Sequence, residues 1–318
     1  MKKTENNTKS QKVIVDVGYG YIKTQVGNIQ KSIPANITYY SYSEALQDAL
    51  ARQPELLGFR YDNSYYSVGG SLPSEIRKER WDDPIETAVL ISAGLVSVNA
   101  PSNIDLVILA PVGHAYKKQS LLSILQPEKY LPQVLRFPSD EPPVNKVSAV
   151  DILPQPMGLA YQSIDAIEDR IGIIVIDIGM GTTDVMSFLV EEGMLEPEWD
   201  RAITHTYKVS GTALENMLMQ STGRSRKIIR KKIERGQISF TDEQKAKIEE
   251  EIVFLLRDWE NDKEDYLVVL GGGGAYILLN GFPEIEYNLQ EKYGWTTTLN
   301  TNPFANVEGI YEMLQAQN

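Results

Sequence analysis

The sequence has 318 residues, enough for two domains of ordinary size. Hydrophobic residues make up 42% of it and charged residues 23%, which excludes a largely disordered chain or a coiled coil. The 31 Lys and Arg against 43 Asp and Glu give a net charge of −12, so the body of the protein repels a phosphate backbone unless basic residues gather locally.

The absence of cysteine excludes disulfides, thiolate metal sites and cysteine nucleophiles. It agrees with a reducing compartment, so a cytoplasmic location is expected. Residues 1–11 are polar and are not followed by the apolar h-region of a signal peptide, so we expect a short disordered arm. The weakly polar stretch 87–98 is too short to span a membrane, and no direct membrane binding is expected.

The first predicted element is a buried strand, residues 13–17, that carries Asp16 near its end. Gly18, Tyr19 and Gly20 follow it, and such a turn lets the backbone reverse sharply and present N–H groups to an anion. Residues 29–98 are rich in Tyr, Ser and Pro and predict a smaller inserted subdomain. Residues 106–110, ending at a proline, predict another buried strand.

The pattern of the first strand and turn recurs at residues 174–181. Asp177 lies at the end of a β-branched strand, and Gly179 and Gly181 follow it. One such turn is usually only a tight turn, but the pair indicates two similar halves that face one another. Two carboxylates and two loops rich in N–H groups suit a metal ion and a phosphate chain, so a magnesium nucleotide is predicted.

Glycines also follow a third apolar run, residues 266–270, and predict a flexible turn at 271–274 before a helix at 275–279. Because buried elements flank Gly271, Gly272, Gly273 and Gly274, this run does not resemble a linker. It favours close approach of the backbone to a flat ligand or a phosphate. A helical stripe over 241–258 completes the pattern of an α/β protein.

These motifs, in this order, resemble the superfamily of actin, Hsp70 and sugar kinase ATPases. The resemblance lies in two phosphate loops, an adenosine motif and two connecting helices, at residues 16–23, 177–184, 270–275, 153–161 and 304–311. It implies an α/β, actin-like (ribonuclease H-like) fold of duplicated domains flanking a nucleotide cleft. Domain I would comprise residues 12–160 and 303–318, with an insertion at about 29–98. Domain II would comprise 161–302, with a subdomain at about 205–265.

Within the superfamily, the spacing from Asp16 to Lys23, the Thr-Thr-Asp ending of the second loop and the segment Ala-Asn-x-x-Gly are similar to bacterial ParM and archaeal ParM-like actins. The resemblance implies an ATPase that binds Mg²⁺ and ATP or ADP and polymerises head to tail into dynamic filaments. The implied partners are further copies of the chain and a DNA-binding adaptor for plasmid segregation.

The resemblance also implies roles for individual residues. Asp16 and Asp177 would hold the hydrated magnesium, and Gln155 would orient the attacking water with Asp184 assisting it. Gln155 has a second interpretation, as a helix N-terminal residue between two prolines. The residues implied to cradle the phosphates are Gly18, Tyr19, Gly20, Lys23, Gly179, Gly181, Thr182 and Thr183.

Around the base and ribose, the resemblance implies contacts from Gly211, Glu215, Arg230 and Glu234, together with the glycine run. Arg230 and Glu234 belong to a basic segment, 224–235. A filament contact and a DNA or adaptor contact are alternative roles for this segment, because a charge run on a helix is usually a solvated face.

Two other functions remain open from the sequence. A small-molecule kinase of the same fold needs a catalytic Asp base, for which Asp151 is the candidate. A cell-shape or scaffolding filament of the MreB type often carries an amphipathic membrane-inserting segment, and none is evident in the polar N-terminal arm. Plasmid or chromosome positioning is therefore preferred.

Overall fold

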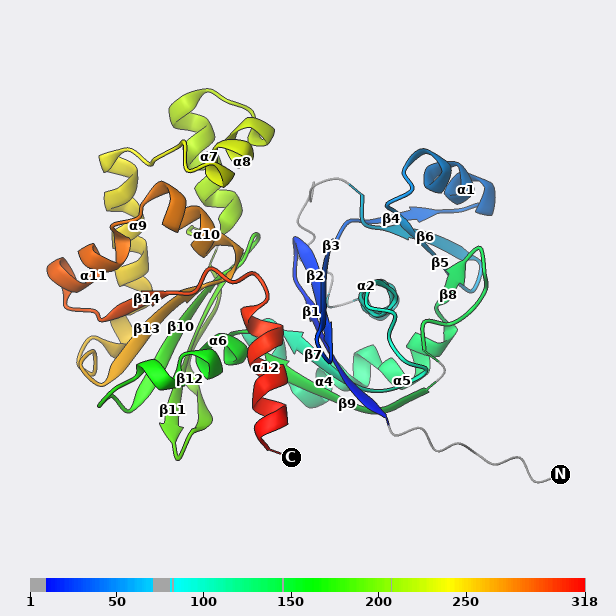
Figure 1. Cartoon of the computed structure of the whole chain (residues 1–318), viewed down its shortest axis with the longest axis horizontal. Coiled ribbons are helices and arrows are strands. Elements are labelled where there is room, and N and C mark those ends of the chain that lie inside the picture. Colours follow the sequence, from blue (N-terminus) through cyan, green and yellow to red (C-terminus); the bar gives the residue numbers. More distant parts are fainter. Residues whose placement is uncertain (1–9, 71–80, 82, 145, 207, 318) are drawn as a thin grey trace. The chain divides into compact units, whose positions relative to one another are not determined.

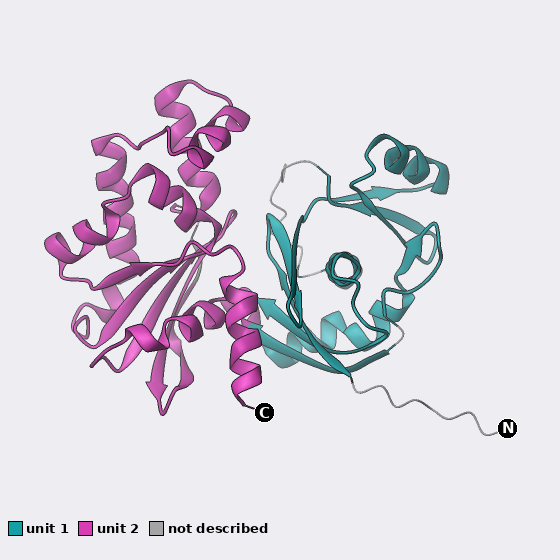
Figure 2. Cartoon of the chain, in the orientation of Figure 1, with its two compact units in different colours: residues 1–110, 117–153 teal, residues 111–116, 154–318 magenta. Residues whose placement is uncertain are grey.

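The computed structural model describes residues 10–70, 81, 83–144, 146–206 and 208–317. They form two compact units, unit 1 with residues 1–110 and 117–153, and unit 2 with residues 111–116 and 154–318 (Figure 2). Both units combine helices with β-sheets, which confirms the predicted α/β class. The expected N-terminal arm, residues 1–9, lies outside the described residues.

Unit 1 contains a five-stranded sheet, of order β3-β2-β1-β7-β9, and a four-stranded sheet, of order β4-β6-β5-β8 (Figure 1). The strands of the first sheet are β1 (Gln11–Val17), β2 (Tyr21–Val26), β3 (Ile29–Pro34), β7 (Asn103–Ala110) and β9 (Lys146–Pro154). Those of the second are β4 (Ile37–Tyr40), β5 (Leu57–Tyr61), β6 (Ser64–Val68) and β8 (Leu135–Phe137). The helices are α1 (Ser43–Arg52), α2 (Pro84–Ser97), α4 (Lys118–Leu125) and α5 (Pro127–Tyr130).

Helix α2 explains the weakly polar stretch at residues 87–98. It contacts β1, β2 and β3 of one sheet and β5 and β6 of the other, and its residues from Thr87 to Leu95 are all buried. Because a helix covered on all sides has no solvent face to keep polar, it is apolar around its whole circumference. Among the described residues, no helix is both long and apolar enough to cross a membrane.

The inserted subdomain differs from its expected limits of 29–98. Strand β3 pairs with β2 and so extends the first sheet, and α2 packs against both sheets. The separate sheet instead takes its fourth strand, β8, from residues 135–137, through antiparallel pairing with β5. A pairing over such a separation leaves no local signal in the sequence, because it depends on tertiary packing.

Unit 2 is built on one sheet of order β12-β11-β10-β13-β14. The strands are β10 (Gly172–Ile178), β11 (Thr183–Glu191), β12 (Met194–Thr206), β13 (Tyr266–Gly271) and β14 (Thr297–Leu299). The helices are α3 (Val112–Ala115), α6 (Pro156–Gln162), α7 (Gly211–Thr222), α8 (Arg226–Glu234), α9 (Asp242–Leu255), α10 (Gly272–Gly281), α11 (Ile285–Tyr293) and α12 (Ala305–Ala316). The predicted strands at 106–110 and 266–270 and the predicted helix at 241–258 are therefore confirmed.

Side chains along β10 point alternately to the two faces of this sheet, and each face packs against different helices. Ile174, Ile176 and Ile178 point into one core with apolar residues of α7 to α11. Asp177, one position out of phase, reaches α12 instead, where Asn306 donates a hydrogen bond to its carboxylate. The period of two thus places the carboxylate on the opposite face from the apolar core.

The predicted duplication is present in the topology. In unit 1, β1 pairs antiparallel with β2 and parallel with β7. In unit 2, β10 pairs antiparallel with β11 and parallel with β13. The two glycine turns therefore join equivalent strands of two similar sheets.

Helices α6 and α12 pack closely within unit 2. A Cβ atom added to Gly158 would collide with the backbone of Asn306, and one added to Gly309 would collide with the backbone of Gly158. Since α6 also contacts β10, β11 and β13, both helices group with the second unit. The sequence predicted that residues 154–160 and 303–318 belong to domain I. In the structure these residues group with unit 2 instead.

Candidate functional site

The two glycine turns have the same local geometry. A Cβ atom on Gly18 would lie 2.8 Å from the carbonyl oxygen of Tyr21, and one on Gly179 would lie 2.8 Å from that of Thr182. Each turn thus needs glycine at its first position, because the carbonyl three residues later closes against it. Tyr19 is buried beside Gly18 in the first turn.

The two turns differ in the residue that faces the aspartate across the hairpin. In unit 1, Asp16 lies opposite Lys23, whose ammonium group is 3.3 Å from the carboxylate. In unit 2, the position equivalent to Lys23 is Asp184, so Asp177 lies opposite another carboxylate. Asp177 and Asp184 are both buried, with exposed fractions of 8% and 3%. Two directly opposed like charges destabilise a sheet, so this pair favours a cation nearby.

The carboxyl edge of the unit 2 sheet gathers most of the predicted residues of that half. The N–H of Gly211 donates to the carbonyl of Gly179 over 2.8 Å, and the N–H of Thr212 donates to that of Met180 over 2.9 Å. These bonds hold the N-terminus of α7 against the second turn, and Ser210 caps the helix through the N–H of Ala213. Gly181, Thr182 and Thr183 are buried in the same turn.

The glycine run begins helix α10 at this same edge. The sequence predicted a flexible turn at 271–274, but β13 ends at Gly271 and the helix starts at Gly272 without an intervening loop. The N-cap residue, Gly271, has no side chain that could cap the helix, so the first N–H groups and the helix dipole favour an anion.

Three of the four glycines are required by packing within unit 2. A Cβ atom on Gly271 would collide with Leu159, and one on Gly274 would collide with Ile178. Gly272 has φ +82°, and an added Cβ atom would collide with the carboxylate of Asp177. Gly273 alone of the four has ordinary space, with its nearest neighbour at 3.6 Å. The sequence predicted that these glycines allow a ligand to approach the backbone closely. In the structure they allow α10 to pack closely against β10.

Asn306 of α12 is a site residue that sequence reasoning did not select. Its amide nitrogen donates to Asp177 over 2.8 Å in a buried hydrogen bond. The only signal in the sequence was the segment Ala-Asn-x-x-Gly, whose glycine permits the close packing of α12 on α6. The contact itself joins residues 129 positions apart, so no local pattern could reveal it.

This edge has the composition of a site for a phosphate and a hard cation. It combines two buried carboxylates, the hydroxyls of Thr182 and Thr183, and the N-termini of α7 and α10. The Oγ1 atom of Thr183 and the Oδ1 atom of Asn306 are buried and have no hydrogen-bond partner among the described residues. Unsatisfied buried acceptors are costly, which supports a ligand at this place.

No group of three or more His, Cys, Asp or Glu residues within the described ranges could by itself hold a metal ion. A Mg²⁺ ion fits this edge nonetheless, because Mg²⁺ commonly takes only one or two carboxylates and completes its shell with phosphate oxygens and water.

Glu215 and Arg230, both predicted near the nucleotide base, meet on α7 and α8. The guanidinium of Arg230 donates twice to the Glu215 carboxylate, over 2.5 and 3.1 Å. Arg226 adds a second cation at 3.2 Å from the same carboxylate, which is only 2% exposed. Glu234 is exposed near the end of α8 and does not join this cluster.

Replacing Glu215 by glutamine is expected to lower the free energy of unfolding by about 2–3 kcal/mol, because two arginine cations would then surround a neutral amide. Urea unfolding measures the change. Glu234→Gln on the same pair of helices is the control, and it should change stability by no more than about 0.5 kcal/mol. Equal stability of the two variants would contradict a structural role for the ion pair.

Gln155 directly precedes α6 and is held between two prolines. It occupies the N-cap position of the helix but makes no capping hydrogen bond with its side chain. Pro156 at the first helical position already favours the helix start. Capping therefore does not account for a glutamine here.

Asp151, the candidate base of a kinase, forms an ion pair with Lys118, and its carboxylate also accepts the N–H of Ile152.

The comparisons with known proteins agree with this architecture. No protein-family profile matches the sequence, and no curated protein matches it. Among solved structures, the chain is similar to a non-polymerisable quadruple mutant of pCBH ParM, at 20% identity and TM-score 0.66, with 96% of this chain and 99% of that chain covered. A 15-stranded ParM filament from Clostridium botulinum matches at 17% identity and TM-score 0.60, with the same coverage.

The archaeal actin homologue Ta0583, solved in complex with ADP, matches at 17% identity and TM-score 0.62, and 96% of this chain and 99% of that chain are covered. These likenesses extend over nearly the whole length of each chain. They show that this chain has the two-domain actin-like fold found in ParM and in the archaeal actin homologue.

Proposed function

We propose that this chain is an actin-like ATPase that binds Mg²⁺ and ATP and assembles head to tail into filaments. The observation that carries the proposal is the carboxyl edge of unit 2, where Asp177, Asp184 and two helix N-termini meet. The complex of the archaeal homologue with ADP and the ParM filament support a nucleotide and self-assembly for proteins of this fold.

In the proposed site, Asp177 holds the hydrated magnesium, and its hydrogen bond from Asn306 keeps the carboxylate oriented. Gly179, Gly181, Thr182, Thr183 and the glycine run supply N–H and hydroxyl groups to the phosphates. The turn of unit 1 is proposed to bind phosphate and metal by the same means, through Gly18, Tyr19, Gly20, Lys23 and Asp16. Magnesium would neutralise the charge that develops on the phosphates.

The proposed filaments would serve to position plasmid DNA through a DNA-binding adaptor. The net charge of −12 disfavours direct binding of DNA by the chain itself. Of the basic segment 224–235, Arg226 and Arg230 are already engaged by Glu215.

Sedimentation tests the proposed assembly. The purified chain should pellet with Mg²⁺ and ATP but not without nucleotide, and electron microscopy of the pellet should show filaments. Failure to pellet in every nucleotide state at high protein concentration would show that the proposal is wrong.

Gln155→Ala is expected to slow ATP hydrolysis by about 10- to 100-fold while leaving nucleotide binding and assembly intact, because only the positioning of the attacking water is lost. Filaments of this variant should therefore persist after the wild type has disassembled. Phosphate release and pelleting, measured on the same samples, check both statements. Hydrolysis at the wild-type rate would remove Gln155 from the mechanism, and Asp184 would become the next residue to test.

A further inference from the structure

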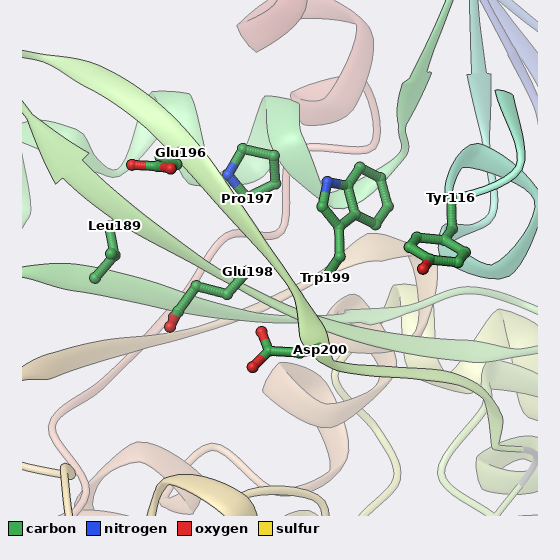
Figure 3. Close-up of a pocket in the computed structure, with 7 residues that line it drawn as sticks. All are labelled: Tyr116, Leu189, Glu196, Pro197, Glu198, Trp199 and Asp200. Carbon is green, nitrogen blue, oxygen red and sulfur yellow. The ribbon is translucent and has the colours of Figure 1, made fainter.

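Strand β12 carries an acidic and aromatic pocket outside the proposed nucleotide site. The pocket has a volume of about 420 Å³ and lies within unit 2 (Figure 3). The residues that line it are Tyr116, Leu189, Glu196, Pro197, Glu198, Trp199 and Asp200. The rings of Tyr116 and Trp199 lie next to one another, with centroids 5.7 Å apart, and Tyr116 is 66% exposed.

Two of the three carboxylates in this pocket are available to a partner. Glu198 accepts a hydrogen bond from the hydroxyl of Tyr266, a group whose pKa is raised by burial and by this bond, so it stays a donor. Glu196 and Asp200 are exposed and form no ion pair with the described residues. β12 is also an end strand of the sheet. Carboxylates beside aromatic faces suit a cation with an apolar neighbour.

Helix α8 presents the complementary surface. Its buried stripe is Ile229 and Ile233, and its second stripe is the pair of arginines engaged by Glu215. The remaining exposed residues, which we name the basic stripe, are Lys227, Ile228 and Lys231 on α8, Arg224 just before the helix and Arg235 directly after it. The four cations of the basic stripe form no ion pair with the described residues, and Ile228 is 44% exposed.

We infer that the basic stripe of one copy docks into the β12 pocket of the next copy, an inference that rests on the proposed self-assembly. Lys227 and Lys231 lie one turn apart on α8, and Glu196 and Asp200 are exposed carboxylates of β12, so each surface presents a pair of like charges to the other. Ile228, which is exposed next to Lys227 on α8, adds an apolar group to the basic stripe.

The positions of the two surfaces explain why this contact propagates. Within unit 2, α8 lies at the end opposite to the β11–β12 hairpin (Figure 1). A contact between two different surfaces at opposite ends is heterologous, and it adds copies in one direction without closing into a dimer. On a chain of net charge −12, a cluster of unpaired cations is also most strongly attracted to an acidic surface of the chain itself.

Charge reversal tests the inference. The strand variant E196K/D200K and the helix variant K227E/K231E should each raise the critical concentration for pelleting with Mg²⁺ and ATP at least about tenfold, because each places like charges across the contact. An equimolar mixture of the two should assemble, since the lysines of one variant then face the glutamates of the other. E44K/D48K, on the exposed face of α1 and with the same spacing, is the control for net charge and should assemble like the wild type.

Several outcomes would overturn the inference. If the wild type assembles and either variant is unaffected, the contact is wrong while the proposed function stands. The same conclusion follows if the mixture does not assemble, or if E44K/D48K is impaired as strongly as the others. If K227E/K231E assembles normally but no longer binds DNA, the basic stripe serves nucleic acid instead. A wild type that forms no filaments would overturn the inference together with the proposed function.

Discussion

Asp177→Asn is expected to leave the fold as stable as the wild type, or more stable by up to about 1 kcal/mol, while nucleotide affinity in the presence of Mg²⁺ falls at least about tenfold. The change removes a charge that lies opposite Asp184, and the new amide oxygen can still accept the hydrogen bond from Asn306. The loss of affinity follows because a neutral amide binds Mg²⁺ poorly. Thermal unfolding without nucleotide and nucleotide titration with and without Mg²⁺ measure the two effects.

The duplicated turn supplies a matched control for this prediction. Asp16→Asn removes the partner of Lys23, whose side chain is only 18% exposed, and should lower the free energy of unfolding by about 1–2 kcal/mol. The two substitutions are chemically identical and occupy equivalent strand positions. Equal effects on stability would contradict the view that the residue across the hairpin determines how each aspartate contributes to the free energy of unfolding.

Asp177→Ala is a less selective test of the same site. It also removes magnesium coordination and should weaken nucleotide binding and assembly. However, it leaves the buried amide of Asn306 without its acceptor, so part of any loss would come from the fold.

Gly272→Ala is expected to lower the free energy of unfolding by about 3 kcal/mol or more. About 1–2 kcal/mol comes from a φ of +82°, which a residue with a Cβ atom adopts at a cost. The remainder comes from the added methyl group, which collides with Asp177 and lies 2.6 Å from the carbonyl oxygen of Ile178. Urea unfolding measures the loss.

Gly273→Ala is the control for Gly272→Ala. Its methyl group would meet nothing nearer than 3.6 Å, and alanine favours a helix over glycine by about 1 kcal/mol, so stability should be unchanged or higher. Similar losses of stability in both variants would show that packing does not constrain Gly272 more than Gly273. Because Gly273→Ala preserves the fold, a loss of nucleotide affinity in it would report directly on the approach of a ligand to the helix N-terminus.

The duplicated strands, the glycine turns and the α/β class could be predicted from the sequence because their signals are local. β-branched residues before Asp16 and Asp177 favour strands, and Gly18 and Gly179 permit the sharp turns that join them. The helix at 241–258 was also predictable from its apolar stripe. In each case the signal lies within a few residues of the element that it determines.

The extent of the inserted subdomain and the start of α10 could not be read locally. A run of glycines has a low helix propensity, and tertiary packing of α10 against Ile178 and Leu159 overrides it. Likewise, strand β8 joins β5 only because the chain returns to that sheet after more than seventy residues.

By itself, the sequence determined which residues could carry the chemistry, namely the aspartates and glycines at the ends of two similar strands. Only the tertiary structure decided their partners: Lys23 for Asp16, Asp184 and Asn306 around Asp177, and two arginines for Glu215. The physical reason is that backbone preference depends on neighbouring residues, whereas a buried charge is balanced by whichever groups packing brings to it. Some of those groups come from distant parts of the chain, as Asn306 does for Asp177.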